Sequence, residues 1–465
     1  MVLSNSMFRD HGSIKPGAFQ DTANGRFVTD VYKPGKDVGN AMGNVGFRLY
    51  LCFLVSFLLH LPARFLPLAE IRSDLLLMAA ITLVIVTRSG TGERQQVEGN
   101  SEGILWLLIA YVLVTLFLVK WPGSVLYTGI PGLAKSMVFF FFTAYLVDTE
   151  KKLAVLIAFF VGGQLFRVAE PLYMHVTSGY WGSSTYMGPG LNLNRLSGAP
   201  VDIINPNGLA YVILSILPFL HYFLTGRSVW KFIMYCGVFA ILMYALALTE
   251  SRTGLVGLTI FAWMVIWKGR YRFLAAIIVF AAIIAVPSMM SPLQRDRYLS
   301  TVDHHVAGGA TAEGRVQGVI KTFEVGLQAP IFGHGLGTSE EANGYALGDW
   351  QPSHDLYTEV FEELGAVGVV IFLSYLWSIF KNVHASLREL GMKPESPSSL
   401  SSAANALHVW IWVYLVTSLA TYGLSSFEWY LIGGLALVIR RLVAERRVVD
   451  TGTAGSASEV RLQTE

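Results

Sequence analysis

Long apolar runs follow one another from about Val45 to Val443, and one wide polar interval, roughly Pro287 to His354, interrupts them. A helix needs about 20 mostly apolar residues to cross a bilayer. Of the 465 residues, 53% are hydrophobic and only 14% are charged, whereas a soluble domain carries about 25% charged residues. The pattern therefore predicts an all-α integral membrane protein.

About twelve apolar cores are candidates for transmembrane helices, provided that the short second core takes in flanking residues. They cover 46–61, 74–87, 103–119, 133–147, 152–169, 206–224, 230–249, 253–267, 271–289, 355–380, 405–422 and 425–442. Only Gly423 and Leu424 separate the last two cores, so we expect a tight hairpin or a broken helix between them.

Lys and Arg in the short connections indicate which side of the membrane each connection faces, because cytoplasmic loops are enriched in both residues. The inner side would hold Arg88, Arg94, Lys151, Lys152, Arg227, Lys231, Lys268, Arg270, Arg272, Lys381, Arg388, Lys393, Arg440, Arg441, Arg446 and Arg447. The outer side would hold fewer cations per residue of loop. We therefore expect both termini in the cytoplasm and the first apolar run to be an uncleaved signal anchor.

Five regions follow from this organisation. They are a cytoplasmic segment 1–44, N-terminal transmembrane helices 45–189, a core 190–380 with an outer loop 287–354, C-terminal transmembrane helices 381–449 and a disordered tail 450–465. The net charge of +2 and the lack of a dense basic tract argue against a nucleic-acid partner. Cys52 and Cys236 both fall in apolar runs, which argues against a disulfide framework or a Cys-based metal site.

Within the wide interval, the stretch 313–328 carries the apolar spacing of a helix. Val316, Ile320, Phe323 and Leu327 recur at three or four residues and would lie on one face. Pro330 ends this pattern, and Gly333, Gly335 and Gly337 follow as a turn. We expect a helix over the membrane face, followed by a loop that leads back into the bilayer.

Three expected helices begin with polar residues at the outer side. Asn205-Pro206-Asn207 opens one, Glu250-Ser251-Arg252-Thr253-Gly254 opens another, and Pro352-Ser353-His354-Asp355 opens a third with Ser353 as its N-cap. A helix N-terminus carries a partial positive charge and free N–H groups, which suit phosphate. Together with the forked guanidiniums of Arg195 and Arg252, these ends would bind a diphosphate.

Other roles remain open for each of these residues. Arg252 would instead pair with Glu250 or reach the headgroups, and Arg195 would be a solvated charge in the polar stretch 177–205. Arg315, on the expected helix, would face water. The two asparagines, Asn205 and Asn207, would be helix caps only.

His354 suits a general base, because imidazole takes up a proton near neutral pH. A base that removes the proton of an attacking hydroxyl makes that hydroxyl a better nucleophile. The alternative is a cap or interfacial histidine. His304, His305 and His334 are expected to face solvent, and no histidine pair has metal-ligand spacing. The glycines from Gly333 to Gly337 follow no strand, so a nucleotide-binding loop is not expected.

These residues resemble the O-antigen ligase and O-antigen polymerase superfamily. Ligases of that family carry His, then Asn, Ser or Gln, nine residues, Gly-x-x-Gly and a small or aliphatic residue. Here His354-Asp355 precedes nine residues and then Gly365-Ala366-Val367-Gly368-Val369. The spacing fits, whereas Asp355 departs from the expected amide or hydroxyl and bears on the acceptor chemistry. Asn205–Ala210, Glu250–Gly254, and Arg315 followed by Pro330–Gly337 are similar to further family patterns, so the resemblance covers about 190–380.

The resemblance implies a GT-C type membrane glycosyltransferase without nucleotide sugar, metal or cofactor. Arg195 and Arg252 would hold an undecaprenyl-diphosphate-linked glycan donor, and His354 would be the base in one inverting displacement onto a glycan or lipid A core acceptor. The expected substrate-binding residues are Arg315, Asn205, Asn207, Ser251 and Asp355. The enzyme would lie in the bacterial inner membrane, in contact with lipids, with its site at the periplasmic face.

Two questions of function stay open at this point. The spacing after His354 favours ligase chemistry, in lipopolysaccharide biosynthesis, while Asp355 keeps an exopolysaccharide or O-antigen polymerase in view. A transporter or flippase for a lipid-linked or anionic solute is the alternative from another class, although its ionisable residues would be expected near the bilayer midplane. A non-catalytic role in a polysaccharide assembly complex is a further alternative.

Overall fold

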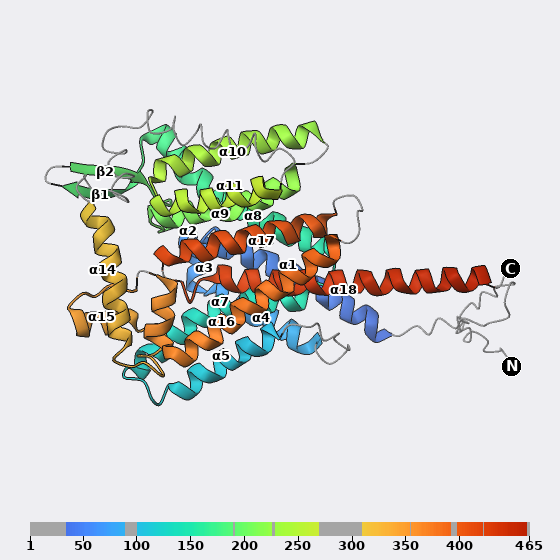
Figure 1. Cartoon of the computed structure of the whole chain (residues 1–465), viewed down its shortest axis with the longest axis horizontal. Coiled ribbons are helices and arrows are strands. Elements are labelled where there is room, and N and C mark those ends of the chain that lie inside the picture. The colour runs from blue at the N-terminus through green and yellow to red at the C-terminus, as the bar shows by residue number, and fades with distance from the viewer. Residues whose placement is uncertain are drawn as a thin grey trace, which may run out of the picture.

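The computed structural model describes residues 34–88, 100–188, 191–225, 228–268, 309–353, 355–391, 398–421 and 423–462. Long helices lie side by side, and a β hairpin, α14 and α15 lie together at one end of the molecule (Figure 1). The first half comprises α1 (Pro34–Leu58), α2 (Leu61–Arg64), α3 (Leu66–Glu70), α4 (Ser73–Arg88), α5 (Ser101–Thr115), α6 (Pro122–Ser124), the π-helical turn η1 (Val125–Gly129), α7 (Ile130–Leu146), α8 (Glu150–Ser178), β1 (Gly182–Gly188), β2 (Leu191–Leu196) and α9 (Pro206–Leu224). The second half comprises α10 (Val229–Thr249), α11 (Arg252–Lys268), α14 (Gly309–Gly326), α15 (Ser339–Leu347), α16 (Leu356–Gly391), α17 (Ser399–Thr417), the 3-10 turn η2 (Ser418–Ala420) and α18 (Phe427–Leu462).

Every expected span within the described residues coincides with a helix over most of its length, and only 271–289 lies outside them. Within the described part of the chain, six helices are long and apolar enough to cross a membrane: Pro122–Leu146, Glu150–Ser178, Pro206–Leu224, Val229–Thr249, Leu356–Gly391 and Ser399–Ala420. Shorter apolar helices cover Met42–Leu58, Ser101–Thr115 and Arg252–Ile266. The expectation of a mainly helical membrane protein is therefore confirmed. The number of about twelve membrane crossings stays a prediction.

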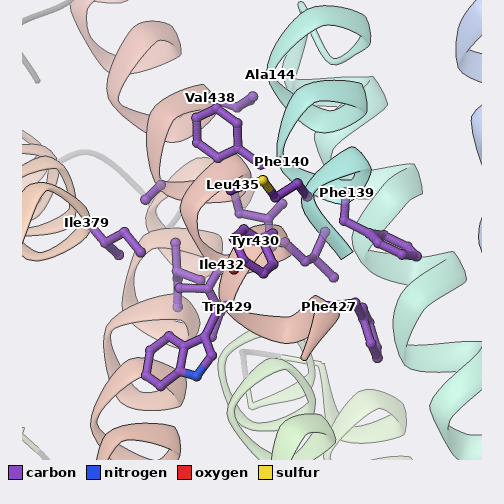
Figure 2. Close-up of a cluster of buried hydrophobic side chains, with 14 of the residues drawn as sticks. Phe139, Phe140, Ala144, Ile379, Phe427, Trp429, Tyr430, Ile432, Leu435 and Val438 are labelled. Carbon is purple, nitrogen blue, oxygen red and sulfur yellow. The ribbon is translucent and has the colours of Figure 1, made fainter. Parts of the chain in front are cut away.

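The larger apolar core forms where α7, α16 and α18 meet (Figure 2). Phe140 of α7, Tyr375 of α16 and Tyr430 of α18 are fully buried there. The helices approach closely because α18 has glycines at the contact. A Cβ at Gly433 would lie 2.0 Å from the Tyr375 hydroxyl oxygen, and one at Gly434 would lie 3.0 Å from the Phe140 carbonyl oxygen. Small residues allow such close packing of transmembrane helices.

A second core surrounds α9, which packs against α8, α10, α11 and α17. Leu209, Ile213 and Leu217 recur along one face of α9 and are fully buried. Because most of the helix surface is enclosed, its N-terminus at Pro206 has a fixed position relative to the start of α11. This position matters for the candidate site.

Four of the cations expected on the inner side form ion pairs that link neighbouring helices and their connections. Arg88 of α4 and Lys152 of α8 both pair with Asp148, at N–O distances of 3.1 and 2.8 Å. Arg446 of α18 pairs with Glu150, and Arg440 pairs with Glu389 of α16 at 2.8 Å. The contacts bring together connections that we expect to share one side of the membrane.

Two elements differ from the sequence-based expectations. Part of the polar stretch 177–205 forms an antiparallel hairpin, in which Ser183 pairs with Arg195; Thr185 and Tyr186 favour extended structure. At the other end of the chain, α18 continues to Leu462, although we expected a disordered tail from residue 450. Each residue added to an existing helix gains a backbone hydrogen bond without a new nucleation cost.

Candidate functional site

Arg195 on β2 is the centre of the candidate site, and it is buried, with only 5% of its surface exposed. Its Nε donates to the carbonyl oxygen of Thr249 at 2.8 Å, and its Nη2 donates to Oδ1 of Asn207 at 3.1 Å. Its Nη1 lies 3.4 Å from Oγ1 of Thr185 on β1. The reading of Arg195 as a solvated loop charge is therefore wrong, because the hairpin directs this side chain against the ends of α9 and α10.

Asn207 joins the first turns of two helices. Its Oδ1 accepts hydrogen bonds from Arg195 and from Oγ of Ser251, the latter at 2.8 Å. Ser251 Oγ in turn accepts from the N–H of Gly254 at 3.1 Å, so Ser251 caps α11. Asn207 is thus not a helix cap, whereas Asn205 is: its Oδ1 accepts from the N–H of Gly208 at 2.8 Å.

Arg252 begins α11 directly after Ser251 and is half-buried. The turn before it is tight, because Glu250 adopts a left-handed conformation with φ 48°. Non-glycine residues rarely adopt this conformation. The turn brings the Thr249 carbonyl to Arg195 and the Ser251 hydroxyl to Asn207. The N-termini of α9 and α11 and the guanidinium of Arg195 therefore lie together, and Arg252 is the first residue of α11. Such a group of positive ends favours an anion.

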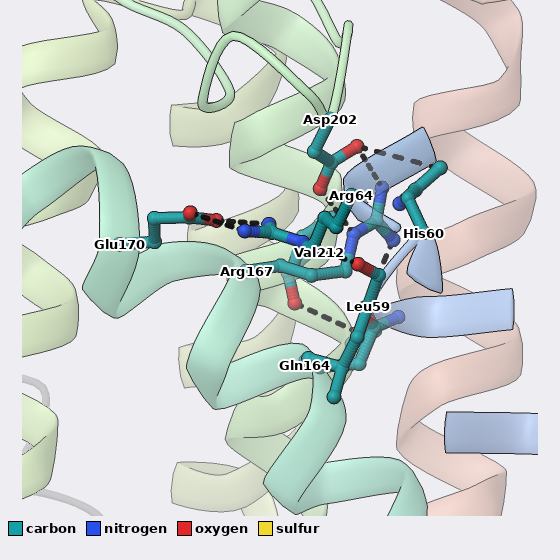
Figure 3. A network of polar contacts seen from close by, with 9 residues as sticks. Leu59, His60, Arg64, Gln164, Arg167, Glu170, Asp202 and Val212 are labelled. Atoms are coloured by element: carbon teal, nitrogen blue, oxygen red, sulfur yellow. Dashed lines mark hydrogen bonds and ion pairs between the residues drawn. The ribbon is translucent and has the colours of Figure 1, made fainter. Parts of the chain in front are cut away.

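A network of ion pairs anchors the segment that leads from β2 to α9 (Figure 3). Asp202 lies on this segment, and its carboxylate accepts from Nε and Nη2 of Arg167 on α8, at 2.6 and 3.0 Å. Arg167 also donates to Gln164 at 3.0 Å. These contacts hold Asp202 in place. In the sequence, Asp202 follows Arg195 by seven residues and precedes Asn207 by five, so both site residues are attached to an anchored segment.

His60 approaches the same carboxylate from the turn between α1 and α2, with Nε2 3.8 Å from Asp202 Oδ1. Burial lowers the pKa of His60 below its usual 6.5; the negative charge of Asp202 acts in the opposite direction, and Arg167 and Arg64 add to the lowering. Arg64 itself forms a forked pair with Glu170. The turn after α1 is therefore held to α8 through charged groups on both sides.

Arg167 and Asp202 were not among the site residues expected from the sequence. The signal was an arginine inside the apolar core 152–169, because an ionisable residue within a transmembrane segment needs a partner and marks a site by default. The partner could not be read from the sequence, since it lies 35 residues away in a polar stretch.

The start of α16 is capped by Asp355 and not by Ser353, so the expected N-cap is wrong. Asp355 Oδ1 accepts from the N–H groups of Tyr357 and Thr358 at 3.0 and 2.9 Å. Ser353 Oγ instead lies 2.9 Å from Oγ1 of Thr358. Aspartate is favoured at this position, because its charge also complements the helix dipole. The departure of Asp355 from the ligase pattern therefore has a structural role.

The structure does not describe the side chains of two expected site residues, His354 and Arg315. His354 lies outside the described residues, and so do His304 and His305. Arg315 lies in α14, which confirms the helix expected over 313–328, but its side chain is outside what the structure describes. The roles proposed for these residues stay predictions.

The glycine turn expected at 333–337 docks into a break in α16. Gly365 interrupts the helix with φ 63° and ψ −170°. The N–H groups of His334 and Gly335 donate to the carbonyl oxygens of Glu362 and Glu363, both at 2.9 Å. The carboxylate of Glu363 also accepts from the N–H of Gly337 at 2.8 Å. The break thus exposes backbone acceptors that the turn satisfies.

Only glycine fits at this contact. A Cβ at Gly333 would lie 2.3 Å from the carbonyl carbon of Glu363, and one at Gly365 would lie 2.4 Å from that of Ile331. His334 is buried, with Nε2 3.0 Å from the Val325 carbonyl oxygen, so the expectation that it faces solvent is wrong. Among the described residues, no group of three His, Cys, Asp or Glu side chains is arranged to hold a metal ion.

The O-antigen ligase family model matches residues 209–373. The matched segment runs from the first turn of α9 into α16, and it confirms the resemblance expected for about 190–380. A chain of a solved structure described as "Structural coordination of polymerization and crosslinking by a peptidoglycan synthase complex" shares 18% identity and a TM-score of 0.41, over 76% of this chain and 99% of the other. No curated protein matches the sequence.

Proposed function

We propose that this chain, which carries an O-antigen ligase segment over residues 209–373, is a membrane glycosyltransferase. It would move a glycan from undecaprenyl diphosphate to an acceptor hydroxyl at the periplasmic face of the bacterial inner membrane. The observation that carries the proposal is the position of Arg195, buried and hydrogen-bonded to Asn207, which is itself bonded to Ser251 at the start of α11.

The diphosphate of the glycan donor would bind where α9 and α11 begin. The positive ends of both helices, the guanidinium of Arg195 and that of Arg252 would offset its charge. These groups belong to a bundle whose second core fixes α9 and α11, so little reorganisation is needed when negative charge develops on the leaving oxygen. Arg315 on α14 would assist from the loop.

The reaction would be one displacement at the anomeric carbon of the glycan donor. His354 accepts the proton of the acceptor hydroxyl, while the hydroxyl oxygen forms a bond to the anomeric carbon. The bond between that carbon and the diphosphate oxygen breaks, and both its electrons leave with the diphosphate. Attack from the opposite face inverts the anomeric centre. The leaving group needs charge neutralisation, which the arginines supply, and no metal or cofactor takes part.

The acceptor decides between a ligase and a polymerase. A ligase would use a lipid A core sugar in lipopolysaccharide biosynthesis, and a polymerase would extend a lipid-linked exopolysaccharide or O-antigen repeat. The spacing from His354 to Gly365 favours the ligase. Helices of the GT-C type would enclose the polyprenyl tail among the spans, with both termini in the cytoplasm.

A reconstituted transfer assay tests the proposal. Proteoliposomes with purified protein receive undecaprenyl-diphosphate-linked glycan, either acceptor and a chelator, but no nucleotide sugar. We expect a glycosylated acceptor and released undecaprenyl diphosphate. Arg252→Lys keeps the charge and loses the forked geometry, so we expect a higher KM for the glycan donor. Arg48→Lys is the matched control, because Arg48 is an exposed arginine on α1.

The same vesicles distinguish the enzyme from a transporter. If an anion or the intact lipid-linked glycan crosses the bilayer while no glycosidic product forms with either acceptor, the glycosyltransferase proposal is wrong. If product forms and Arg252→Lys behaves like Arg48→Lys, the diphosphate site has been assigned to the wrong residues.

A further inference from the structure

Three aromatic side chains form a cluster on α15 and its neighbours, which we call the aromatic platform: the exposed Tyr345 and Trp350 and the half-buried Trp121. The rings of Trp121 and Tyr345 are stacked, with centroids 5.6 Å apart and planes at 17°. Trp350 meets Tyr345 edge to face at 5.2 Å. Tyr345 is 66% exposed and Trp350 is 54% exposed. Two segments that are distant in sequence therefore present adjoining rings to the outside.

Neighbouring groups hold the platform rigid. The ammonium of Lys120 lies 4.7 Å from the ring centroid of Trp121 and 5.7 Å from that of Tyr345. A Cβ at Gly344 would lie 2.4 Å from the Trp350 ring, so the indole rests directly on the backbone of α15. Rings fixed in this way lose little conformational entropy when a ligand covers them.

The platform continues into the buried glycine turn. The ring of Trp121 packs against that of His334, with centroids 5.8 Å apart. His334 lies in the turn that docks into the break of α16. The platform is therefore connected through packed groups to the helix whose start Asp355 caps.

The platform also lies close to the start of α16 along the chain. Trp350 is five residues before Asp355, and a chain extends at most about 3.6 Å per residue, so the two lie within about 18 Å. Asn343 Nδ2 donates to the Gln351 carbonyl oxygen at 3.0 Å, which ties the intervening segment to α15. A chain-like ligand that reacts near the start of α16 would reach the rings with its next sugars.

The residues around the rings favour a saccharide over a lipid surface. The faces of aromatic rings are electron-rich, and the polarised C–H groups on one face of a pyranose pack against them. Glu340, five residues before Tyr345, and Asp349, directly before Trp350, are exposed and offer acceptors for sugar hydroxyls. Anionic lipid headgroups would be repelled by these carboxylates. The start of α10 differs from the platform, because its exposed residues Trp230, Phe232 and Ile233 are large and apolar and suit a lipid surface.

We propose that the aromatic platform binds the glycan of the lipid-linked substrate beyond its reacting sugar. This inference rests on the proposed function and names a subsite for it. Tyr345 and Trp350 supply the stacking faces, and Lys120 fixes the rings. The subsite would favour long glycans, because each added sugar on the platform contributes binding energy away from the reacting carbon.

Binding of lipid-free oligosaccharide to the protein in nanodiscs tests the subsite without transfer. The probe is the oligosaccharide released from the glycan donor by mild acid, measured by calorimetry. We expect Tyr345→Leu and Trp350→Leu each to weaken binding about 5- to 10-fold, in line with about 1 kcal/mol per ring contact. Tyr345→Phe keeps the ring and should stay within about twofold. Tyr127→Leu is the matched control, an 81% exposed tyrosine of η1.

Wild-type affinity for the oligosaccharide in both leucine variants would overturn the inference. It would also be overturned if Tyr127→Leu lost as much affinity as Tyr345→Leu and Trp350→Leu. Brominated lipids supply a second readout: if they quench the fluorescence that Trp350→Phe removes, the platform lies in the bilayer and the inference is wrong. Failure of the proposed function is distinguishable, because oligosaccharide binding would then persist without any glycosidic product. Melting temperatures check that each exposed-ring variant is folded.

Discussion

Arg195 and Asn207 are hydrogen-bonded across the junction of the hairpin and α9, with Nη2 3.1 Å from Oδ1. The same amide oxygen accepts from Ser251, 44 residues later in the chain. One asparagine therefore sets the relative position of a buried cation and two helix N-termini. Removal of that oxygen should loosen the candidate diphosphate site without removal of any positive charge.

Asn207→Leu tests this coupling. The variant leaves the buried donors of Arg195 and Ser251 without their shared acceptor, so we expect a loss of about 1–3 kcal/mol in stability and a higher KM for the glycan donor. Asn100→Ala is the matched control, because it removes only the cap of α5, where Asn100 Oδ1 accepts from the N–H of Gly103, at a cost of about 1 kcal/mol. Thermal unfolding in detergent and transfer kinetics provide the two measurements. Equal KM changes in the two variants would contradict the coupling.

The ion pair between Arg167 and Asp202 should act as one unit. Arg167→Gln or Asp202→Asn alone leaves a buried charge without its partner, which costs about 3–5 kcal/mol. The double variant removes both charges, so we expect it to be more stable than the sum of the single losses predicts. Thermal unfolding of all four proteins gives the coupling. Additive losses would show that the two side chains do not depend on each other.

Acid should destabilise the fold through His60, because burial disfavours its charged form. The pKa of His60 is lower in the folded protein than its usual 6.5, so the unfolded chain binds more protons as pH falls through that value. The contribution of neutral His60 to stability is thus fully present above about pH 6.5 and decreases below it. We expect the stability of His60→Asn to depend less on pH between about pH 7 and about pH 5 than that of the wild type. Melting temperatures measured across this range test the expectation. An unchanged slope would reject this contribution.

The break in α16 should tolerate no side chain at Gly365. Its φ of 63° is unfavourable for other residues, and a Cβ there would overlap the backbone of Ile331. We expect Gly365→Ala to cost about 3 kcal/mol or more, since strain and overpacking both contribute. Gly314→Ala in α14 is the control, because a Cβ there meets nothing within 4 Å. If both variants melted at the same temperature, the docked turn would not depend on this glycine.

Local patterns in the sequence predicted most helices and the turn at 333–337. Apolar runs of sufficient length locate α9, α10 and α17, and the spacing of Val316 and Phe323 locates α14. These features depend on residues close in the chain. The hairpin that carries Arg195 was missed, because the alternation in β2, Leu191-Asn192-Leu193-Asn194, is short and its partner β1 has none.

Contacts across long sequence separations explain the other misses. Gly365 sits in a continuous apolar run, and its role is visible only once the turn around Gly333 lies against it. His334 is buried for the same reason, since α14 covers it through Val325. Both Ser353 and Asp355 suit an N-cap, and only the backbone geometry distinguishes them. Motifs singled out Arg195, Asn207 and Ser251, which the structure brings together, and their roles stay predictions. Arg167 and Asp202 belong to no such motif.

Transfer by the His354→Ala variant tests the central claim most directly. Wild-type protein and the variant, each in proteoliposomes with lipid-linked glycan and acceptor, are compared by mass spectrometry of the glycosylated acceptor, with binding of the glycan donor measured in parallel. We predict that donor binding is retained and that the transfer rate falls about 100-fold or more, because a general base contributes about that factor. Undiminished product formation by a folded His354→Ala variant would contradict the account.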